Sequence, residues 1–176
     1  MRIISGKYRG KQLSPPAGFN ARPTTDFAKE SLFNILANSY DFEEIRVLDL
    51  FSGTGGISYE FASRGCPAID AVEINPQHIA FIKRTAKELM LDQLHVIRND
   101  AFKFLDFCKA TYDIIFADPP YAFSNLELIP NIVFTRNLLN KNGLLIVEHS
   151  DSNDFSKDDH FVERRHYGGV NFSFFK

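Results

Sequence analysis

The stretch VLDLFSGTGG, residues 47–56, decides the fold because an apolar run passes directly into a glycine-rich turn. A short apolar run indicates a buried strand, and Gly53 and Gly55 let the backbone approach a ligand with no Cβ in the way. The turn alone is a weak functional signal. Ser58 stands where the third glycine of a G-x-G-x-x-G motif would be, and no Walker A lysine follows, so a dinucleotide site is disfavoured.

Similar apolar runs recur and alternate with helical patterns. Residues 56–64 end at Gly65, as helices commonly do, and residues 76–90 carry apolar side chains at helical spacing after Asn75. This alternation predicts right-handed βαβ units and a mostly parallel sheet covered on both faces. The expected strands are IRVLDL (45–50), AIDAVE (68–73), LHVIRN (94–99), YDIIFA (112–117) and LLIVEH (144–149).

The two ends of the chain depart from this pattern. HFVERRHY and VNFSFFK flank Gly168 and Gly169, a two-residue hairpin signal that predicts a final antiparallel strand. The acidic run 151–163 is expected to be a solvated loop. Near the start, MRIISGKYRGKQL is typical of a small hairpin, and Thr24, Thr25 and Asp26 can cap a helix that runs to about residue 38.

The composition limits the classes of protein to which the chain can belong. A chain of 176 residues with 44% apolar composition can bury one core, so we expect a single domain over residues 1–176. Residues 1–40 would be the hairpin and helix extension, and residues 41–176 the catalytic core. Cys66, Cys108 and the five histidines show no metal-ligand spacing, and there is no signal peptide or membrane span. We therefore expect a soluble cytoplasmic protein with no metal and no membrane contact. Because no long apolar stripe demands a partner, we also expect a monomer.

Carboxylates follow several of the expected strands. Asp49 adjoins the glycine turn, Glu73 ends the second strand about twenty residues later, and Asp100 follows the third. In such sheets the ligand lies beyond the carboxyl ends of the strands, where Glu73 can accept hydrogen bonds from ribose hydroxyls. A charged Asp49 there favours a cation, such as an amino group or a sulfonium. The alternative is that Asp49 and Asp100 are helix caps and Glu73 a solvated strand end.

The segment FADPPYAF, residues 116–123, closes the fourth strand. Two adjacent prolines remove two backbone donors, so the segment predicts a rigid loop that aims Asp118 and Tyr121 at a ligand.

The first 25 residues are basic. They contain five cationic side chains and no Asp or Glu, with Tyr8 among them. Basic and aromatic residues mixed in this way suit a phosphate backbone with exposed bases, and in a strand Lys7, Arg9 and Lys11 would project from one face. The alternative is that these charges only keep an exposed strand edge soluble. The predicted RNA contacts are Lys7, Tyr8, Arg9, Lys11, Arg22 and Thr24.

The order VLDLFSGTGG, VEIN, RNDA and FADPPY resembles that of S-adenosylmethionine-dependent methyltransferases that modify exocyclic amino groups, whose signature is (Asp/Asn)-Pro-Pro-(Tyr/Phe/Trp). With MRIISGKYRGKQL, RPTTDFAKESLFNIL and ASRG, the chain is similar over nearly its whole length to the RsmD family of bacterial small-subunit ribosomal RNA (guanine-N2)-methyltransferases. Ser52 and Thr54 replace the expected Ala and Ser, and Tyr121 replaces a common Phe, which leaves the chemistry unchanged.

The resemblance implies a Rossmann-like fold with a mostly parallel seven-stranded sheet, S-adenosylmethionine as cofactor, and ribosomal RNA in an assembling small subunit as substrate. It puts the target base at Asp118, Pro119, Pro120 and Tyr121. It puts the methyl donor at Asp49, Phe51, Gly53, Gly55, Glu73, Ile74, Asp100, Ala101 and Asp118.

The chemistry then assigns roles to the rigid loop. A guanine N2 amino group is a poor nucleophile, and acceptors at Asp118 and the Pro119 carbonyl would hold it in a pyramidal geometry and stabilise its growing positive charge. Tyr121 would stack on the displaced base. One alternative is a DNA adenine-N6 methyltransferase, but such enzymes usually carry a sizeable recognition domain. A second is a protein glutamine methyltransferase, for which Asn is expected at position 118. A third is a non-catalytic RNA-binding assembly factor, in which a broken motif is expected.

Overall fold

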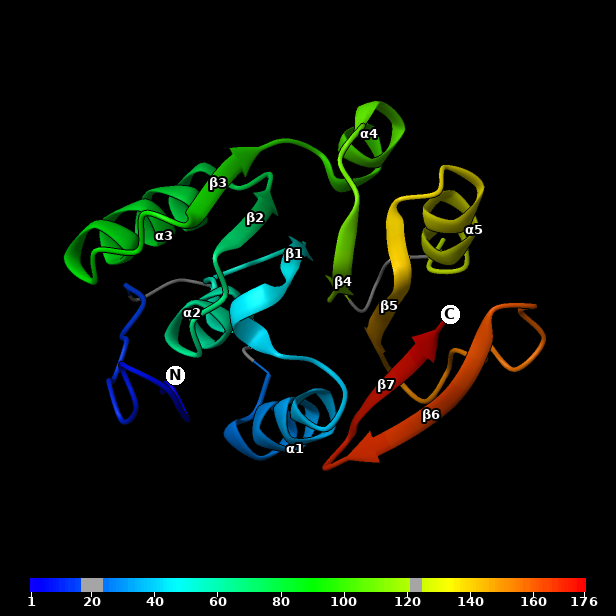
Figure 1. Ribbon diagram of the computed structural model, residues 1–176, viewed down its shortest axis with the longest axis horizontal. Helices are drawn as coiled ribbons and strands as arrows, with labels where there is room; N and C mark the ends of the chain where they lie inside the picture. The colour runs from blue at the N-terminus through cyan, green and yellow to red at the C-terminus, as the bar shows by residue number, and fades with distance from the viewer. Residues whose placement is uncertain (17–23, 121–124) are drawn as a thin grey trace.

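The computed structural model describes residues 1–16, 24–120 and 125–176, and these form a sheet with helices on both faces (Figure 1). The strands are β1 Arg46–Leu50, β2 Ala68–Glu73, β3 Leu94–Arg98, β4 Tyr112–Ala117, β5 Leu139–His149, β6 Phe161–Tyr167 and β7 Val170–Phe175. The helices are α1 Asp26–Ala37, the short 3-10 helix η1 Phe42–Glu44, α2 Gly56–Ser63, α3 Pro76–Glu88, α4 Ala101–Phe107 and α5 Leu128–Thr135.

The seven strands form one sheet in the order β3-β2-β1-β4-β5-β7-β6. Strands β1 to β5 are parallel, and β7 pairs antiparallel with both β5 and β6. This confirms the predicted α/β fold with a C-terminal antiparallel hairpin. The strand order reverses between β1 and β4, and ligands of such sheets bind beyond the carboxyl ends of the strands at this point.

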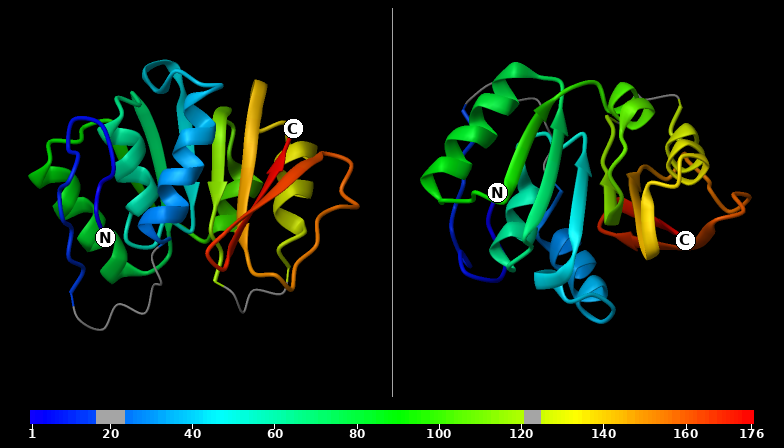
Figure 2. Two further views of the ribbon diagram at one scale, coloured as in Figure 1. Left: turned by 90° about the horizontal axis from the view of Figure 1, so that it is seen from below. Right: turned by 45° about the horizontal axis from the view of Figure 1, so that its top comes forward.

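Two apolar layers cover the sheet. Helices α1, α2 and α3 lie on one face, and α4 and α5 lie on the other (Figure 2). Their buried apolar side chains form the two layers. Ile3 and Leu13 from the first segment are buried in the same layer as α1, so this segment and α1 share the core of the sheet. No helix in the described part of the chain is long and apolar enough to cross a bilayer.

The first segment folds back on itself as a small hairpin, as expected, but its described residues form no pair of extended strands. It contains a single antiparallel bridge, between Arg2 and Gln12, and residues 7–10 form a turn. Gly6 and Gly10 have φ angles of 79° and 82°, which is where a glycine is favoured over any other residue. The predicted alternation of Lys7, Arg9 and Lys11 on one strand face is therefore wrong.

A buried carboxylate and a serine of α2 fasten this segment. Glu60 accepts hydrogen bonds from the backbone N–H groups of Ile4 and Ser5, at 2.8 and 3.0 Å. Ser63 Oγ accepts from the Tyr8 N–H at 2.9 Å and donates to the Ser5 carbonyl at 2.6 Å. A Cβ at Gly6 would lie 1.9 Å from the Ser63 carbonyl oxygen, so only glycine permits this approach.

The acidic run 151–163 is partly structured. β6 begins at Phe161, and Phe155 is buried in the apolar layer under α5. The prediction of a wholly solvated loop is therefore wrong, because one aromatic side chain anchors its middle.

Candidate functional site

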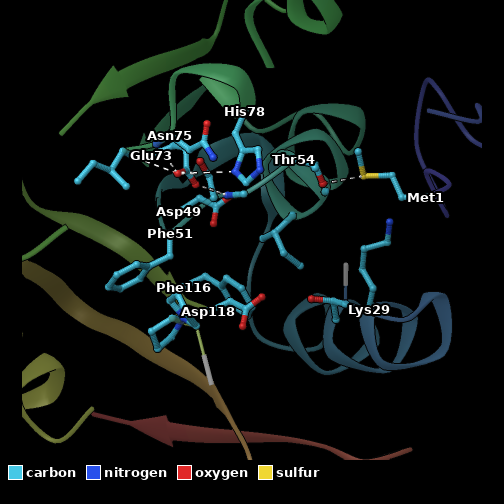
Figure 3. A pocket seen from close by; sticks show the side chains of 18 of the residues that line it. Met1, Lys29, Asp49, Phe51, Thr54, Glu73, Asn75, His78, Phe116 and Asp118 are labelled. Atoms are coloured by element: carbon cyan, nitrogen blue, oxygen red, sulfur yellow. Dashed lines mark hydrogen bonds and ion pairs between the residues drawn. The ribbon is translucent and has the colours of Figure 1, made fainter. Parts of the chain in front are cut away.

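A cavity of about 540 Å³ lies at the carboxyl ends of β1, β2 and β4 (Figure 3). This volume is in the range of small-molecule sites. In Figure 3, Glu73 and His78 lie at one end of the cavity and Asp118 at the other, with Asp49 between them. The lining residues are Met1, Thr24, Lys29, Asp49, Phe51, Ser52, Gly53, Thr54, Gly56, Ile57, Glu73, Ile74, Asn75, Gln77, His78, Phe116, Asp118, Pro119 and Pro120.

The glycine turn forms the wall next to β1. Phe51 has a φ of 60°, a strained conformation for a residue other than glycine that is often found at binding sites. Gly53, also with positive φ, lines the cavity. Gly55 does not line it: a Cβ there would lie 2.8 Å from the ring of the buried Tyr59, so this glycine permits close packing beneath the turn.

Asp49 links the turn to the start of α2. The N-cap residue of this helix, Gly55, has no side chain to cap it. Asp49 Oδ2 instead accepts a hydrogen bond from the Ser58 N–H at 3.1 Å and another from the Ser58 hydroxyl. Asp49 is buried, and burial raises its pKa from 3.8 to about 7, against the lowering effect of the Ser58 bonds. A positive charge in the cavity would stabilise the ionised form.

Glu73 joins the ends of β1 and β2. Its carboxylate accepts hydrogen bonds from the N–H groups of Gly53 at 2.8 Å, Ile74 at 2.9 Å and Asn75 at 2.8 Å. His78 Nδ1 also lies 3.7 Å from Oε1, whereas Oε2 accepts only from Gly53 among the described residues. Each carboxylate oxygen offers about two acceptor sites, so Oε2 keeps one for a ligand hydroxyl. The side chain of Ile74 beside it is largely exposed and lines the cavity, where an apolar ring would fit.

Asp100 and Ala101 lie outside this lining. Asp100 Oδ1 accepts hydrogen bonds from the N–H groups of Phe102 and Lys103, both at 3.0 Å, and so caps α4. The helix-cap alternative therefore describes Asp100, whereas Asp49 and Glu73 combine a structural role with a place on the cavity wall.

Asp118 follows β4 at the other end of the cavity. Its N–H donates to the Leu50 carbonyl at 3.3 Å, and its carboxylate receives no hydrogen bond from the described residues. Burial raises its pKa well above 3.8, and the carboxylates of Glu148 and Asp49 raise it further. Pro119 and Pro120 also line the cavity, whereas the predicted Tyr121 lies outside the described residues.

The predicted RNA contacts divide into two groups. Thr24 lines the cavity and donates to Glu148 at 2.9 Å, and Arg22 lies outside the described residues. Lys7, Tyr8, Arg9 and Lys11 lie at the far end of α2, since the Lys7 N–H donates to the Ser63 carbonyl at 2.7 Å and the Tyr8 hydroxyl donates to the Leu89 carbonyl after α3. An eight-residue helix separates them from the glycine turn, a distance of about 12 Å.

The sequence reasoning missed Lys29. Its Nζ donates to the Arg2 carbonyl and lies 3.7 Å from Glu60 Oε2, and the side chain is buried at the cavity wall. Burial lowers its pKa, with Glu60 opposing the change. The signal was a lysine within the apolar stripe of α1, between Ala28 and Leu32. It places a cationic side chain in a cavity that the carboxylates of Asp49, Glu73 and Asp118 also line.

Proteins similar to this chain are known in sequence and in structure. The family described as Conserved hypothetical protein 95 matches residues 1–176. The chain is 33% identical over 152 residues to Ribosomal RNA small subunit methyltransferase D of Buchnera aphidicola subsp. Baizongia pistaciae, covering 86% of this chain and 77% of that protein.

Two solved structures extend the comparison. The putative methyltransferase yhhF from Escherichia coli superposes with a TM-score of 0.86 at 27% identity, over 99% of this chain and 96% of that one. The fold is also shared with SMU.776, a putative methyltransferase complexed with SAH, at a TM-score of 0.64 and 21% identity, over 84% of this chain and 49% of that one.

Proposed function

Because this chain belongs to the RsmD-type family described as Conserved hypothetical protein 95, we propose that it methylates the exocyclic N2 amino group of a guanine in small-subunit ribosomal RNA. At the coarser level, it is an S-adenosylmethionine-dependent ribosomal RNA methyltransferase. One observation carries the finer proposal: the carboxylate of Asp118 stands at the cavity with no hydrogen bond from the described residues, where it can accept the N–H groups of an incoming amino group.

The cavity residues fit the methyl donor. S-adenosylmethionine supplies a methyl carbon on a positively charged sulfur, together with an adenosine and an amino acid group. Asp49 offers a buried negative charge to its cationic part, and the free acceptor site of Glu73 suits a ribose hydroxyl. Gly53 leaves room for close approach of the ligand, and Ile74 offers an apolar contact for the adenine ring.

The substrate amino group would be held from the other end of the cavity. Asp118 and the Pro119 carbonyl accept its N–H groups and favour the pyramidal geometry in which the nitrogen lone pair can attack. The new N–C bond forms as the C–S bond breaks and its electron pair returns to sulfur. The positive charge that appears on nitrogen lies beside Asp118, which stabilises it, and the proton then leaves to Asp118 or to water.

The family similarity, rather than the acceptor, favours guanine in ribosomal RNA over adenine in DNA. Guanine N2 and adenine N6 both present N–H groups that Asp118 and the Pro119 carbonyl could accept, whereas the similar protein is a ribosomal RNA small subunit methyltransferase.

Mass spectrometry of ribosomal RNA nucleosides tests the function directly. Small-subunit RNA from a strain that lacks the gene should lose one N2-methylguanosine, and the purified chain with S-adenosylmethionine should restore it. Protein-free RNA and an assembling small-subunit particle should be compared as substrates, since we propose the particle. Formation of N6-methyladenosine instead would overturn the guanine assignment.

Removing the charge of Glu73 should weaken donor binding. We expect Glu73→Gln to lower the affinity for S-adenosylhomocysteine about tenfold, because one charge-assisted hydrogen bond to a ribose hydroxyl is worth roughly 1.5 to 3 kcal/mol. Calorimetry measures the affinity, and Glu88→Gln, a surface carboxylate at the end of α3, is the control. Equal affinities for wild type and Glu73→Gln would place the ribose elsewhere.

Residues 7–11, which we call the basic turn, offer a second contact with a large RNA. They lie about 12 Å along α2 from the glycine turn of the cavity. Neutralising Lys7, Arg9 and Lys11 together should lower the slope of log affinity against log salt by about 2 units, because each phosphate contact releases roughly 0.7 to 0.9 of a counterion. Filter binding of ribosomal RNA at several salt concentrations measures the slope. Donor affinity should stay the same, and an unchanged slope would leave these charges with a solubility role only.

A further inference from the structure

We propose that Phe27 and Tyr167 form a stacking site for an RNA base next to the methylated guanine. This proposal rests on the proposed function and adds a recognition surface at the cavity rim. We call this surface the hairpin rim, and it consists of Phe27, Tyr167, Gly168 and Gly169.

The sheet register brings the hairpin rim to the cavity end of the molecule. Asn171 pairs with His149, the last residue of β5, so the turn between β6 and β7 lies beyond the carboxyl end of that strand. Asp118 follows Ala117, which pairs with Val147 of the same strand. Figure 1 shows the end of β6 and the start of β7 meeting α1 there.

The start of α1 completes the rim. The hydrogen bond from Thr24 to Glu148 fixes the chain just before the helix at the same end of β5. Phe27 in the first turn of α1 therefore lies between the cavity-lining Thr24 and the β6–β7 turn. A Cβ at Gly168 would lie 4.0 Å from Phe27 Cδ1, so ring and turn are neighbours.

The two aromatic rings have different surroundings. The ring of Tyr167 packs against the buried Phe172, with 6.1 Å between the two ring centroids. The centroid of Tyr167 lies 6.0 Å from that of Phe27. Phe27 meets Tyr167 edge to face and is 63% exposed, a large exposed fraction for an aromatic side chain. A Cβ at Gly169 would meet nothing within 4 Å, so a planar group has space beside the turn.

The size and charge of the rim fit a nucleotide. A stable interface between two proteins buries about 800 Å² of surface on each partner, whereas the two rings and the glycine turn match the size of a single base. Arg2 is held near Phe27 by Asp26, and Arg165 lies two residues before Tyr167 and is held by Glu163. Both guanidinium groups are about half exposed and keep donors for a phosphate. A base stacked here would help to offset the cost of displacing its neighbour, the target guanine.

The chain contains no tryptophan, which allows a direct test. Phe27→Trp places a single tryptophan on the rim, and Phe107→Trp places one at an 80% exposed position at the end of α4, away from the cavity. Small-subunit ribosomal RNA, either protein-free or in an assembling particle, should quench the fluorescence of the Phe27→Trp protein and leave that of the Phe107→Trp protein nearly unchanged. Equal quenching at both positions, or none at position 27, would overturn the proposal.

Methylation kinetics provide the functional readout. Phe27→Ala should lower kcat/KM for the RNA roughly tenfold, Phe27→Tyr should restore it, and Phe107→Ala should have no effect. All variants should bind S-adenosylhomocysteine as wild type does. If Phe27→Ala methylates normally, the rim proposal fails while the proposed function stands. If wild type binds the donor but methylates no RNA, the proposed function fails. Quenching by small-subunit ribosomal proteins without RNA would assign the rim to a protein partner and overturn the proposal.

Discussion

Replacing Asp118 with alanine is expected to lower methyl transfer at least roughly 100-fold, because the variant loses a preorganised acceptor that acts as charge develops on the nucleophile. Donor affinity should change little, since we propose that Asp49, Glu73 and the glycine turn hold the donor. The folded protein should not become less stable, because burial and two nearby carboxylates already disfavour the charged form of Asp118. Single-turnover methylation measures the loss, and thermal unfolding checks the fold.

Two further results would separate the roles of Asp118. Asp118→Asn keeps one oxygen acceptor without the charge, so it should retain more activity than Asp118→Ala. In the wild type, the raised pKa of Asp118 should place the acidic limb of the pH–rate profile above the usual carboxyl range, since the ionised form is the acceptor. A normal rate in Asp118→Ala would contradict the proposed role, and an unfolded variant would show that the carboxylate is structural.

The second large effect is expected for Asp49→Asn. The free energy of unfolding should rise, whereas the affinity for the methyl donor should fall. The folded pKa of Asp49, about 7, lies above the ordinary 3.8, so the folded state binds the extra proton and loses stability as pH rises between these values. Asp49→Asn removes that loss while keeping an oxygen for the Ser58 bonds. The variant should gain roughly 3 kcal/mol of unfolding free energy relative to wild type between pH 5 and pH 8.

Donor binding by the same variant should weaken. Without the negative charge, the affinity for S-adenosylmethionine should fall tenfold or more, corresponding to at least about 1.4 kcal/mol. Urea unfolding at pH 5 and pH 8 and calorimetry with the donor measure the two effects, with the exposed Glu30→Gln as control. A stability difference that does not depend on pH would show that Asp49 ionises normally in the folded protein.

The sequence predicted the central strands well because buried parallel strands are continuous apolar runs. Residues 68–73 and 112–117 match β2 and β4 residue for residue. The first half of β5 was missed, since Asn140, Lys141 and Asn142 are polar and the β4 pairing shifts register beside them. α5 was also missed, because it carries Pro130, which a helix tolerates only in its first turn.

The candidate site could be predicted where a sequence motif sets the local backbone conformation. It could be predicted less well where contacts between distant parts of the chain set the position of a segment. Asp49, Gly53, Glu73 and Asp118 line one cavity because strand ends converge at one edge of a parallel sheet, and their roles in binding stay predictions. The position of the basic turn depends on contacts with Ser63 and Leu89, far along the sequence, which no local pattern encodes.

The attachment of the first segment to α2 also bears on the order of events during synthesis. Tyr8 leaves the ribosome 55 residues before Ser63 and 81 residues before Leu89, its two hydrogen-bond partners. At about 5 to 20 residues per second, the wait for Leu89 lasts roughly 4 to 16 seconds. During this time Ile3 and the basic side chains around Tyr8 are exposed to the surface of the ribosome that is making the chain. The part of the protein that is translated first therefore reaches its final position only after both partner helices exist.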